Sequence, residues 1–400
     1  MKVRFIGLKR FDNMFTNREP KSLKSDSKYD TLNHKRELKG GIKLRLIHCS
    51  DLHLDSKMES NLSPRQAKER SGEICATFVR MVRWAQAHGV RGILLAGDLF
   101  DTGRVRKKTA DLVLDTVARA ADLDFYYLRG NHDDARDPFA GRTLPGNLHT
   151  FGPRWTGYEL EDVTITGLEL DRENCTGCYD ELALNREKTN IVLLHGQTAP
   201  QPGEDQVCLP RLRGRGIDYL ALGHIHSFRR EELDDRGQWC YCGCLEGRGF
   251  DECGEKGFAL LDIRDGRVAA EFVPFAARQV CQASVDITHS TTITQIHQAM
   301  EEASADFEDG SMVKFVLTGS YTPETQKDLT TLTELMSQRF WFVKIKDESW
   351  FRLDRAAYEH DASLKGQFIR LVMASDRAED VKARIICAGL QALAGEAVEV

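Results

Sequence analysis

Residues 44–53 read LRLIHCSDLH, an apolar run that ends at two side chains of metal-binding type, Asp51 and His53. The same arrangement, a short apolar run followed by polar ligands, occurs four more times along the chain. A short run rich in Leu, Ile, Val and Tyr is typical of a buried strand. We therefore predict five buried strands with ligands at their ends, over Lys43–Cys49, Gly92–Ala96, Phe125–Leu128, Ile191–Leu194 and Ile217–Leu222.

The polar residues behind these runs form one set of oxygen and nitrogen donors. In sheets whose strands alternate with helices, ligands gather beyond the strand ends, where the loops converge. Packing so many donors at one rim would be costly without cations to neutralise them, so we expect two metal ions. The candidate site residues are Asp51, His53, Asp98, Asn131, His132, Asp133, His195, His224 and His226.

The chemistry of the set indicates which metals it suits. It contains carboxylates, an amide and imidazoles but no thiolate, which favours manganese, with iron or zinc as alternatives. Two-metal phosphoryl-transfer sites hold their ions about 3.5–4 Å apart, and we expect one carboxylate to bridge them. Asp98 is the candidate because it stands alone after its strand in the middle of the set. A single cluster would be weak evidence for a metal site, since Asn, Asp and Gly also gather in ordinary turns. The five clusters together indicate a metal site.

The motifs DxH, GDLFD, GNHD, an isolated His195 and GHIH resemble the signature of the calcineurin-like metallophosphoesterases. The exact sequences of these motifs are similar to those of the SbcD-type DNA repair exonucleases, and within them to the YhaO-like bacterial branch. They read GDLFDTG, GNHDD, HGQ and DYLALGHIH. The resemblance covers residues 43–278 strongly and the rest of the chain weakly. It implies an α/β fold: a four-layer α/β/β/α metallophosphoesterase sandwich with a smaller C-terminal α/β capping domain.

The resemblance also implies a role for each site residue. His132 would face the scissile phosphate, Asp133 would orient the His132 side chain, and a water activated by both metals would attack phosphorus. One metal would be held by Asp51, His53, Asp98 and His226. The second metal would be held by Asp98, Asn131, His195 and His224.

The implied function is manganese-dependent hydrolysis of DNA, as exonuclease and endonuclease, in DNA repair with an SbcC-like coiled-coil ATPase. The chain has no GxxxxGK[ST] motif, so an ATP-driven step would need that partner. A homodimer stays open. The alternatives are a phosphoesterase of this fold that acts on cyclic nucleotides or phosphoproteins, and a non-catalytic scaffold. GNHD in place of GNHE argues against a phosphoprotein phosphatase, and the complete donor set argues against a scaffold.

Composition gives the setting. The net charge is −6, but residues 1–42 carry eleven Lys/Arg and five Asp/Glu, so the remainder carries −12. A nuclease needs only a local basic groove, and acidic ligands count as negative until cations bind, so the charge does not exclude DNA. We expect no membrane span and no secretory signal. Eleven cysteines without disulfide-scaffold spacing indicate the cytoplasm.

The pattern along the chain predicts three regions: a disordered basic extension over residues 1–42, a catalytic domain over 43–278 and a capping or partner-binding domain over 279–400. Helices are predicted over Arg65–His88, which stops at Gly89, and over Lys108–Ala121. Turn signals at 235–237 and 265–266 predict hairpins. Whether the Gly-rich stretch 243–257 approaches the metal rim is left open.

The predicted cap contains no ligand cluster, so we expect it to shape substrate access or bind a partner. Cys175 and Cys178, and the alternating Cys240, Cys242 and Cys244, match no zinc-ribbon spacing and are interpreted as free thiols. The predicted elements of the cap are strands Val280–Ile287, Met312–Leu317, Trp341–Lys346 and Gln367–Met373, and helices Thr292–Ser304, Pro323–Gln338 and Ala378–Leu393.

Overall fold

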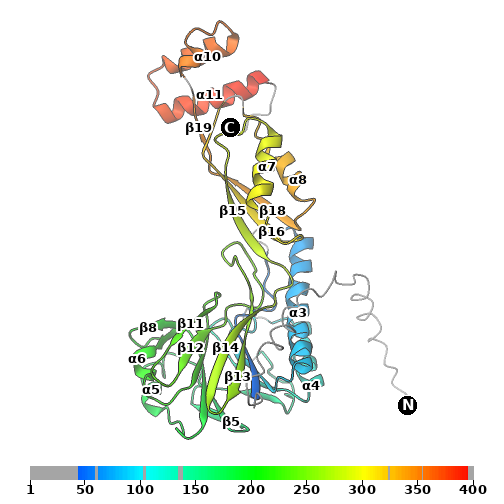
Figure 1. Cartoon of the computed structure of the whole chain (residues 1–400), viewed down its shortest axis with the longest axis vertical. Coiled ribbons are helices and arrows are strands. Elements are labelled where there is room, and N and C mark those ends of the chain that lie inside the picture. Colours follow the sequence, from blue (N-terminus) through cyan, green and yellow to red (C-terminus); the bar gives the residue numbers. More distant parts are fainter. Residues whose placement is uncertain are drawn as a thin grey trace, which may run out of the picture. The chain divides into compact units, whose positions relative to one another are not determined.

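A computed structural model of the chain describes residues 44–58, 62–101, 105–133, 138–322, 325–353 and 355–394. Within these residues it shows two large β-sheets, a smaller sheet and helices (Figure 1). The extension predicted over residues 1–42 lies outside the described residues. Each helix of the described residues is too short or too polar to cross a bilayer.

The first large sheet contains three of the five predicted strands, side by side and parallel. Its first strand also pairs antiparallel with a strand from much later in the chain, Leu46 lying opposite Leu261. In spatial order the strands are β14 (Arg267–Pro274), β13 (Gly257–Arg264), β1 (Leu44–Cys49), β2 (Gly92–Ala96), β3 (Asp124–Leu128) and β4 (Leu148–Thr150).

The second large sheet contains the other two predicted strands, β7 and β10, again parallel neighbours. All five strands predicted from the sequence are therefore confirmed. In spatial order this sheet is β11 (Arg229–Glu232), β12 (Gln238–Tyr241), β10 (Tyr219–Gly223), β7 (Thr189–His195), β6 (Val163–Gly167) and β5 (Thr156–Leu160). A two-stranded ribbon of β8 (Gln197–Ala199) and β9 (Gln206–Cys208) follows β7.

The two sheets pack face to face around an apolar core. Alternate residues of each strand face this core because successive side chains of a strand point to opposite sides. Leu46 and Leu94 of the first sheet meet Ile191 and Leu193 of the second, and all four are inaccessible to solvent. Truncating one such leucine to alanine typically costs about 2–5 kcal/mol of stability. This core fixes the two sheets against each other and therefore fixes the ligands at their ends.

Helices cover the outer faces. α3 (Pro64–Ala87) starts at a capping box on Ser63 and packs Trp84 against Phe258 of β13, with 5.2 Å between ring centroids. It ends at Ala87 with His88 as its C-cap, and Gly89 follows with φ +68°, as predicted. α4 (Lys107–Arg119) packs beside α3. The second sheet is covered by two one-turn helices, α5 (Cys178–Glu181) and α6 (Leu209–Leu212).

Two hairpins follow the second sheet's parallel strands, as the turn signals predict. β11 and β12 pair antiparallel, as do β13 and β14. The β13–β14 turn has Asp265 and Gly266 at φ +46° and +75°, the left-handed values that a two-residue hairpin turn needs. The α/β fold class, with two face-to-face sheets between helices, is confirmed.

The C-terminal segment has its own three-stranded parallel sheet with two helices on one face. A second, mainly helical core follows, with Phe351 of the last short strand packed against it. The elements are β15 (Val280–Asp286), α7 (Ile293–Ala303), β16 (Met312–Thr318), β17 (Ser320–Tyr321), α8 (Leu329–Met336), β18 (Phe342–Asp347), β19 (Trp350–Phe351), α9 (Arg355–Tyr358), α10 (Leu364–Met373) and α11 (Glu379–Ala394). The domain boundary at 278/279 stays a prediction.

One predicted strand of this segment is wrong. Residues Gln367–Met373 belong to α10, which starts at Ser363, whose hydroxyl accepts a hydrogen bond from the Gly366 amide at 3.1 Å. The apolar residues here fit a helical period as well, since Gly366, Ile369 and Val372 are buried at every third position. α10 packs on α11, and this pairing buries the helical face.

Candidate metal centre

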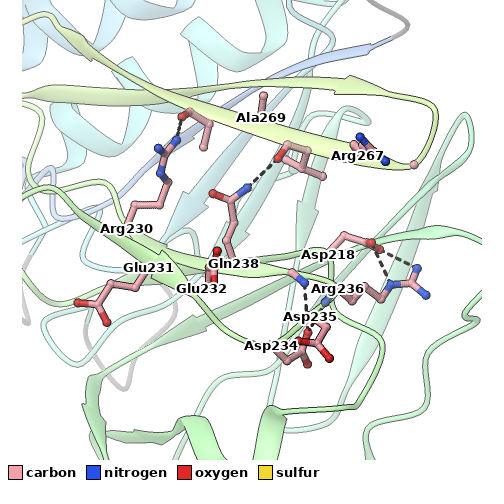
Figure 2. A pocket seen from close by; sticks show the side chains of 14 residues that line it. Asp218, Arg230, Glu231, Glu232, Asp234, Asp235, Arg236, Gln238, Arg267 and Ala269 are labelled. Carbon is pink, nitrogen blue, oxygen red and sulfur yellow. Dashed lines mark hydrogen bonds and ion pairs between the residues drawn. The ribbon is translucent and has the colours of Figure 1, made fainter.

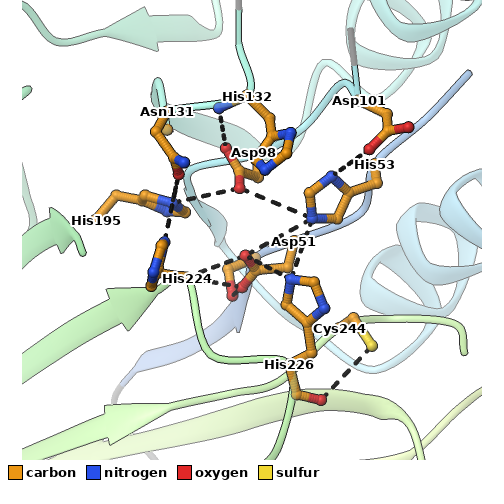
Figure 3. Close-up of polar contacts among 12 residues, drawn as sticks. Asp51, His53, Asp98, Asp101, Asn131, His132, His195, His224, His226 and Cys244 are labelled. Carbon is orange, nitrogen blue, oxygen red and sulfur yellow. Dashed lines mark hydrogen bonds and ion pairs between the residues drawn. The ribbon is translucent and has the colours of Figure 1, made fainter. Parts of the chain in front are cut away.

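The predicted ligands come together at the carboxyl ends of five strands, where the two sheets meet (Figure 3). Parallel strands place their carboxyl ends at one edge, which explains why residues far apart in sequence converge. The first sheet contributes Asp51, His53, Asp98, Asn131 and His132. The second sheet contributes His195, His224 and His226.

One group of donors contains His53, His226 and Asp51. The two Nε2 atoms of His53 and His226 lie 3.2 Å apart. Asp51 Oδ1 lies 3.6 Å from His226 Nε2 and 4.0 Å from His53 Nε2. Two imidazole nitrogens and a carboxylate oxygen that face one point are the donor types that a divalent transition metal binds. The residues therefore fit the first expected cation.

The second group is built around Asn131. Its Oδ1 lies 3.0 Å from His195 Nε2 and 3.3 Å from His224 Nδ1. His195 Nδ1 lies 3.0 Å from the Ala96 carbonyl oxygen, which can only accept, so the neutral ring carries its proton on Nδ1. The Nε2 lone pair then faces the other donors, as a metal ligand requires. This group fits the second expected cation.

Asp98 lies between the two groups. Its Oδ2 is 3.7 Å from His53 Nε2 and 3.4 Å from His195 Nε2, and its Oδ1 accepts a hydrogen bond from the His132 amide at 2.9 Å. Burial acts to raise the pKa of Asp98, but the two histidines and the amide outweigh burial and hold it well below the usual value. The position is that of a carboxylate that could be shared by two cations.

The backbone at the site is unusual. Four candidate ligands have positive φ values, which residues other than glycine rarely adopt. These are Asp51 at +53°, His53 at +46°, Asp98 at +53° and His224 at +103°. Each turns the chain sharply where its strand ends, so that the side chain reaches the common rim. Such conformations cost roughly 1–3 kcal/mol each and cluster at active sites, although Asp265 adopts one in a hairpin turn.

Two glycines, Gly97 and Gly130, leave room for the ligands to converge. A Cβ atom on Gly97 would lie 2.0 Å from His195 Nδ1, and one on Gly130 would lie 2.2 Å from Asp98 Oδ1. Both glycines of the GD and GN motifs are therefore required by the ligand that packs on them.

His132 is exposed beside the first group, with its ring centroid 5.1 Å from that of His53. Its predicted role toward a phosphate stays a prediction. The predicted role of Asp133 needs correction. Its buried carboxylate accepts hydrogen bonds from the amides of Phe100, Gly130 and Leu99, at 2.8, 3.0 and 3.2 Å, and not from the His132 ring. Asp133 thus joins the GD and GN loops through these three amides.

Three functional candidates were missed from the sequence. Asp101 Oδ1 lies 3.1 Å from His53 Nδ1, and Glu252 Oε1 lies 2.7 Å from His226 Nδ1. Arg248 contacts both carboxylates. Asp101 belongs to the quoted GDLFD motif, which could have identified it; Glu252 and Arg248 lie in the Gly-rich stretch 243–257, which does reach the metal rim.

The histidines differ in basicity because their surroundings differ. Burial acts to lower the pKa of His195, but Asp98 outweighs it and raises the pKa to about 9. Burial lowers the pKa of His53 more than Asp101 raises it. For His226 the Glu252 hydrogen bond and the Asp51 charge outweigh burial, so its pKa is raised.

A separate cavity of about 900 Å³ lies between the two hairpins (Figure 2). Asp218, which precedes β10, and Arg236 close one side through a two-pronged ion pair at 2.9 Å. The metal ligands follow the opposite end of β10, so this cavity is not part of the metal centre.

Comparison with known proteins connects this site to a family. Residues 44–228 match the family model described as "Calcineurin-like phosphoesterase". The chain is 30% identical over 341 residues, 76% of this chain and 82% of the relative, to "Uncharacterized metallophosphoesterase YhaO" of Bacillus subtilis (strain 168). It is 24% identical over 339 residues, 78% of this chain and 84% of the relative, to "DNA double-strand break repair protein Mre11" of Sulfurisphaera tokodaii. It is 24% identical over 274 residues, 56% of this chain and 66% of the relative, to a subunit of the nuclease SbcCD of Escherichia coli (strain K12).

Proposed function

The chain belongs to the calcineurin-like phosphoesterase family, and from that premise we propose that it is a two-metal DNA nuclease that acts in DNA repair in the cytoplasm. The observation that carries the proposal is the position of Asp98 Oδ2, 3.7 Å from a nitrogen of the first donor group and 3.4 Å from one of the second. A carboxylate placed between two donor groups is the core of a two-metal phosphoryl-transfer site.

The residues suggest a division of labour in phosphodiester hydrolysis. Bound cations would supply positive charge for the phosphoryl oxygens and a water of lowered pKa. His132 is exposed at the rim, so its ring can reach a phosphate and protonate or stabilise the leaving oxygen. Asp133 holds the two loops that carry Asp98 and Asn131, and we propose it as a positioning residue. The mixed donor set favours manganese.

DNA as substrate is supported by the relatives. A relative named for DNA double-strand break repair and one named as part of a nuclease match this chain, and the former covers 78% of it, which extends beyond residues 44–228. The C-terminal sheet adds a physical reason. Helices α7 and α8 pack on one face, and the other face places Lys314 in register with Lys344 and Gln282. Paired lysines on one face of a sheet suit a phosphate backbone.

The assay for this proposal uses the full chain loaded with manganese. It is given linear duplex DNA, hairpin DNA, a cyclic nucleotide, a phosphopeptide and a chromogenic phosphodiester in parallel, with Asp98→Asn as the inactive control. DNA cleavage that is lost in Asp98→Asn supports the proposal. Preferred turnover of the cyclic nucleotide or phosphopeptide, with DNA intact, would replace it with another phosphoesterase activity. A chain that holds two metals and hydrolyses none of these would be a scaffold.

The proposed partner is an SbcC-like coiled-coil ATPase. The helical C-terminal core exposes Leu364, Leu371 and Leu393 by 67, 74 and 48%. Leu364 and Leu371 are seven residues apart on α10 and so share one face of the helix, as a coiled-coil helix requires of its partner surface. A contiguous apolar patch on a surface marks an interaction site, and we propose that Leu364 and Leu371 belong to one.

Leu371→Glu tests the partner surface. It should abolish co-purification with the ATPase while leaving manganese content and turnover of the chromogenic phosphodiester unchanged. Retained co-purification would refute the assignment. Sedimentation of the isolated chain is the second readout, because a dimer that Leu371→Glu converts to monomer would assign this face to a homodimer instead.

A further inference from the structure

The two donor groups of the metal centre are supported in different ways. In the second group, His195 Nδ1 is held by a backbone oxygen, that of Ala96, at 3.0 Å. In the first group, both histidines face side-chain carboxylates: Asp101 Oδ1 lies 3.1 Å from His53 Nδ1 as an ion-pair contact without hydrogen-bond geometry, and Glu252 Oε1 is hydrogen-bonded to His226 Nδ1 at 2.7 Å. A side-chain carboxylate can rotate unless other groups hold it. The orientation of the first-group histidines therefore depends on the groups that hold the carboxylates of Asp101 and Glu252.

Arg248 supplies that restraint. Its Nη1 lies 2.9 Å from Asp101 Oδ1, and its Nη2 and Nε lie 2.8 and 3.2 Å from Glu252 Oε1. The Arg248 amide also donates to Glu252 Oε2 at 2.7 Å. The side chain is 18% exposed, so water competes little for these bonds. A planar guanidinium holds two carboxylates in directions that its rigid plane fixes, whereas the three donors of an ammonium rotate on a flexible stem.

We propose that Arg248 is a positioning residue for the first metal: through Asp101 and Glu252 it sets the orientation of His53 and His226 and so controls the affinity of that metal alone. The proposal rests on the two-metal centre of the proposed function, but not on DNA as the substrate. Partners of this kind typically change metal affinity by about 10–100-fold when lost.

The loop that carries Arg248 is itself fixed on both sides. Glu246 is buried and accepts hydrogen bonds from Arg70 and Thr77 of α3, both at 2.6 Å. On the other side, the Gly254 amide donates to the carbonyl of Val280, the first residue of β15, at 3.0 Å. The orientation of the first-metal histidines therefore depends on the strand that opens the C-terminal sheet as well as on the catalytic sheets.

Charge and orientation act in opposite directions when Arg248 is changed. The guanidinium repels a nearby cation, so removing its charge would tighten metal binding, whereas losing the orientation would weaken it. Arg248→Lys separates the two effects because it keeps the charge and loses the two-directional grip. It is therefore the deciding variant, and Arg236→Lys is its matched control. Arg236 grips the partly buried carboxylate of Asp218 at 2.9 Å, at the far end of β10 (Figure 2).

The experiment titrates metal-free chain with manganese by calorimetry and records manganese paramagnetic resonance, which distinguishes a single ion from a coupled pair. Arg248→Lys should weaken one binding event by about 10–100-fold. At intermediate manganese it should show the spectrum of a single ion where the wild type shows a pair. Arg236→Lys should match the wild type in both readouts. Asp101→Asn should weaken the same binding event. The double variant, with both Arg248→Lys and Asp101→Asn, should bind this metal no more weakly than the weaker-binding of the two single variants, since both changes act through one support.

Two results would overturn the proposal: an Arg248→Lys titration that equals the wild type, or equal weakening of both binding events. If Arg248→Lys lowers the unfolding temperature so far that it cannot be titrated, Asp101→Asn decides instead, because it leaves the Arg248–Glu252 contacts in place. None of these readouts uses DNA. A chain that fails to cut DNA would refute the proposed function and leave this test intact.

Discussion

Gly97→Ala is the substitution for which the structure gives the clearest expectation. Gly97 has φ +91°, and a Cβ atom there would lie 2.0 Å from Nδ1 and 2.5 Å from Cγ of His195. His195 is 5% exposed and its Nδ1 donates to the Ala96 carbonyl, so the ring has no free space to retreat into without breaking that bond. The added methyl group must push the imidazole away from Asn131 and Asp98.

The size of the effect follows from three parts. The left-handed backbone costs alanine about 1–2 kcal/mol. Forcing a methyl group into a packed site costs about 1–3 kcal/mol. Losing the His195–Ala96 hydrogen bond costs about 0.5–1.5 kcal/mol. We therefore expect Gly97→Ala to destabilise the metal-free chain by about 3–6 kcal/mol and to weaken one metal about 10–100-fold.

Gly89→Ala is the matched control. Gly89 also has a left-handed φ, +68°, but a Cβ atom there would have no neighbour within 4 Å. It should cost only the backbone part, about 1–2 kcal/mol, and bind two metals normally. Denaturant unfolding of the metal-free chains and manganese titration give the two readouts. If Gly97→Ala and Gly89→Ala unfold at the same denaturant concentration and bind metal alike, the packing of His195 on Gly97 is wrong.

Three further predictions concern the same centre. Asp98→Asn removes the shared carboxylate and should lower the metal content, measured by emission spectroscopy, for both ions; retention of two metals would refute the bridging position. His132→Ala should keep both metals and lose phosphodiester hydrolysis by about 10²–10⁴-fold, whereas His195→Ala should lose one metal; equal metal loss in the two variants would remove the distinction. Chelation should lower the unfolding temperature, because ligand at 100 times its Kd stabilises by about 2.7 kcal/mol; an unchanged temperature would mean that the folded chain holds no metal.

The strands and the convergence of the candidate ligands could be predicted from the sequence because each candidate ligand stands next to the strand that positions it. An apolar run such as Gly92–Ala96 predicts a buried strand, and Asp98 follows two residues later. Parallel pairing then brings the strand ends together without any further information. The same locality explains why the shared position of Asp98 could be inferred from its place in the middle of the set.

The supports of the ligands could not be predicted in this way. Glu252 reaches His226 from a loop with no periodicity, and Arg248 is defined only by the two carboxylates that it joins in space. From the sequence we expect Asp133 to orient its neighbour His132. Its carboxylate instead accepts hydrogen bonds from the amides of Phe100 and Leu99, which belong to another loop. Contacts of this kind depend on tertiary packing rather than on neighbouring residues.

The error at Gln367–Met373 has a different origin. A short apolar segment has no periodicity that separates a strand from a buried helix. The signal that decides here is Ser363, whose hydroxyl caps the first turn of α10, together with the burial of α10 against α11. Only the cap could have been recognised from the sequence.

The antiparallel pairing of β1 with β13 has a consequence for how the chain is made. Among the described residues β1 is the first strand to leave the ribosome, yet Leu46 pairs with Leu261, so one edge of β1 stays open until most of the chain has been synthesised. Closing such a long loop is slow, and an open apolar edge invites wrong pairing in the meantime. His226 and Glu252 also emerge late, so the nascent chain has neither a complete first sheet nor a complete metal centre. The topology therefore predicts that the growing chain needs protection until β13 has been added, and that the proposed metals would bind late in its synthesis.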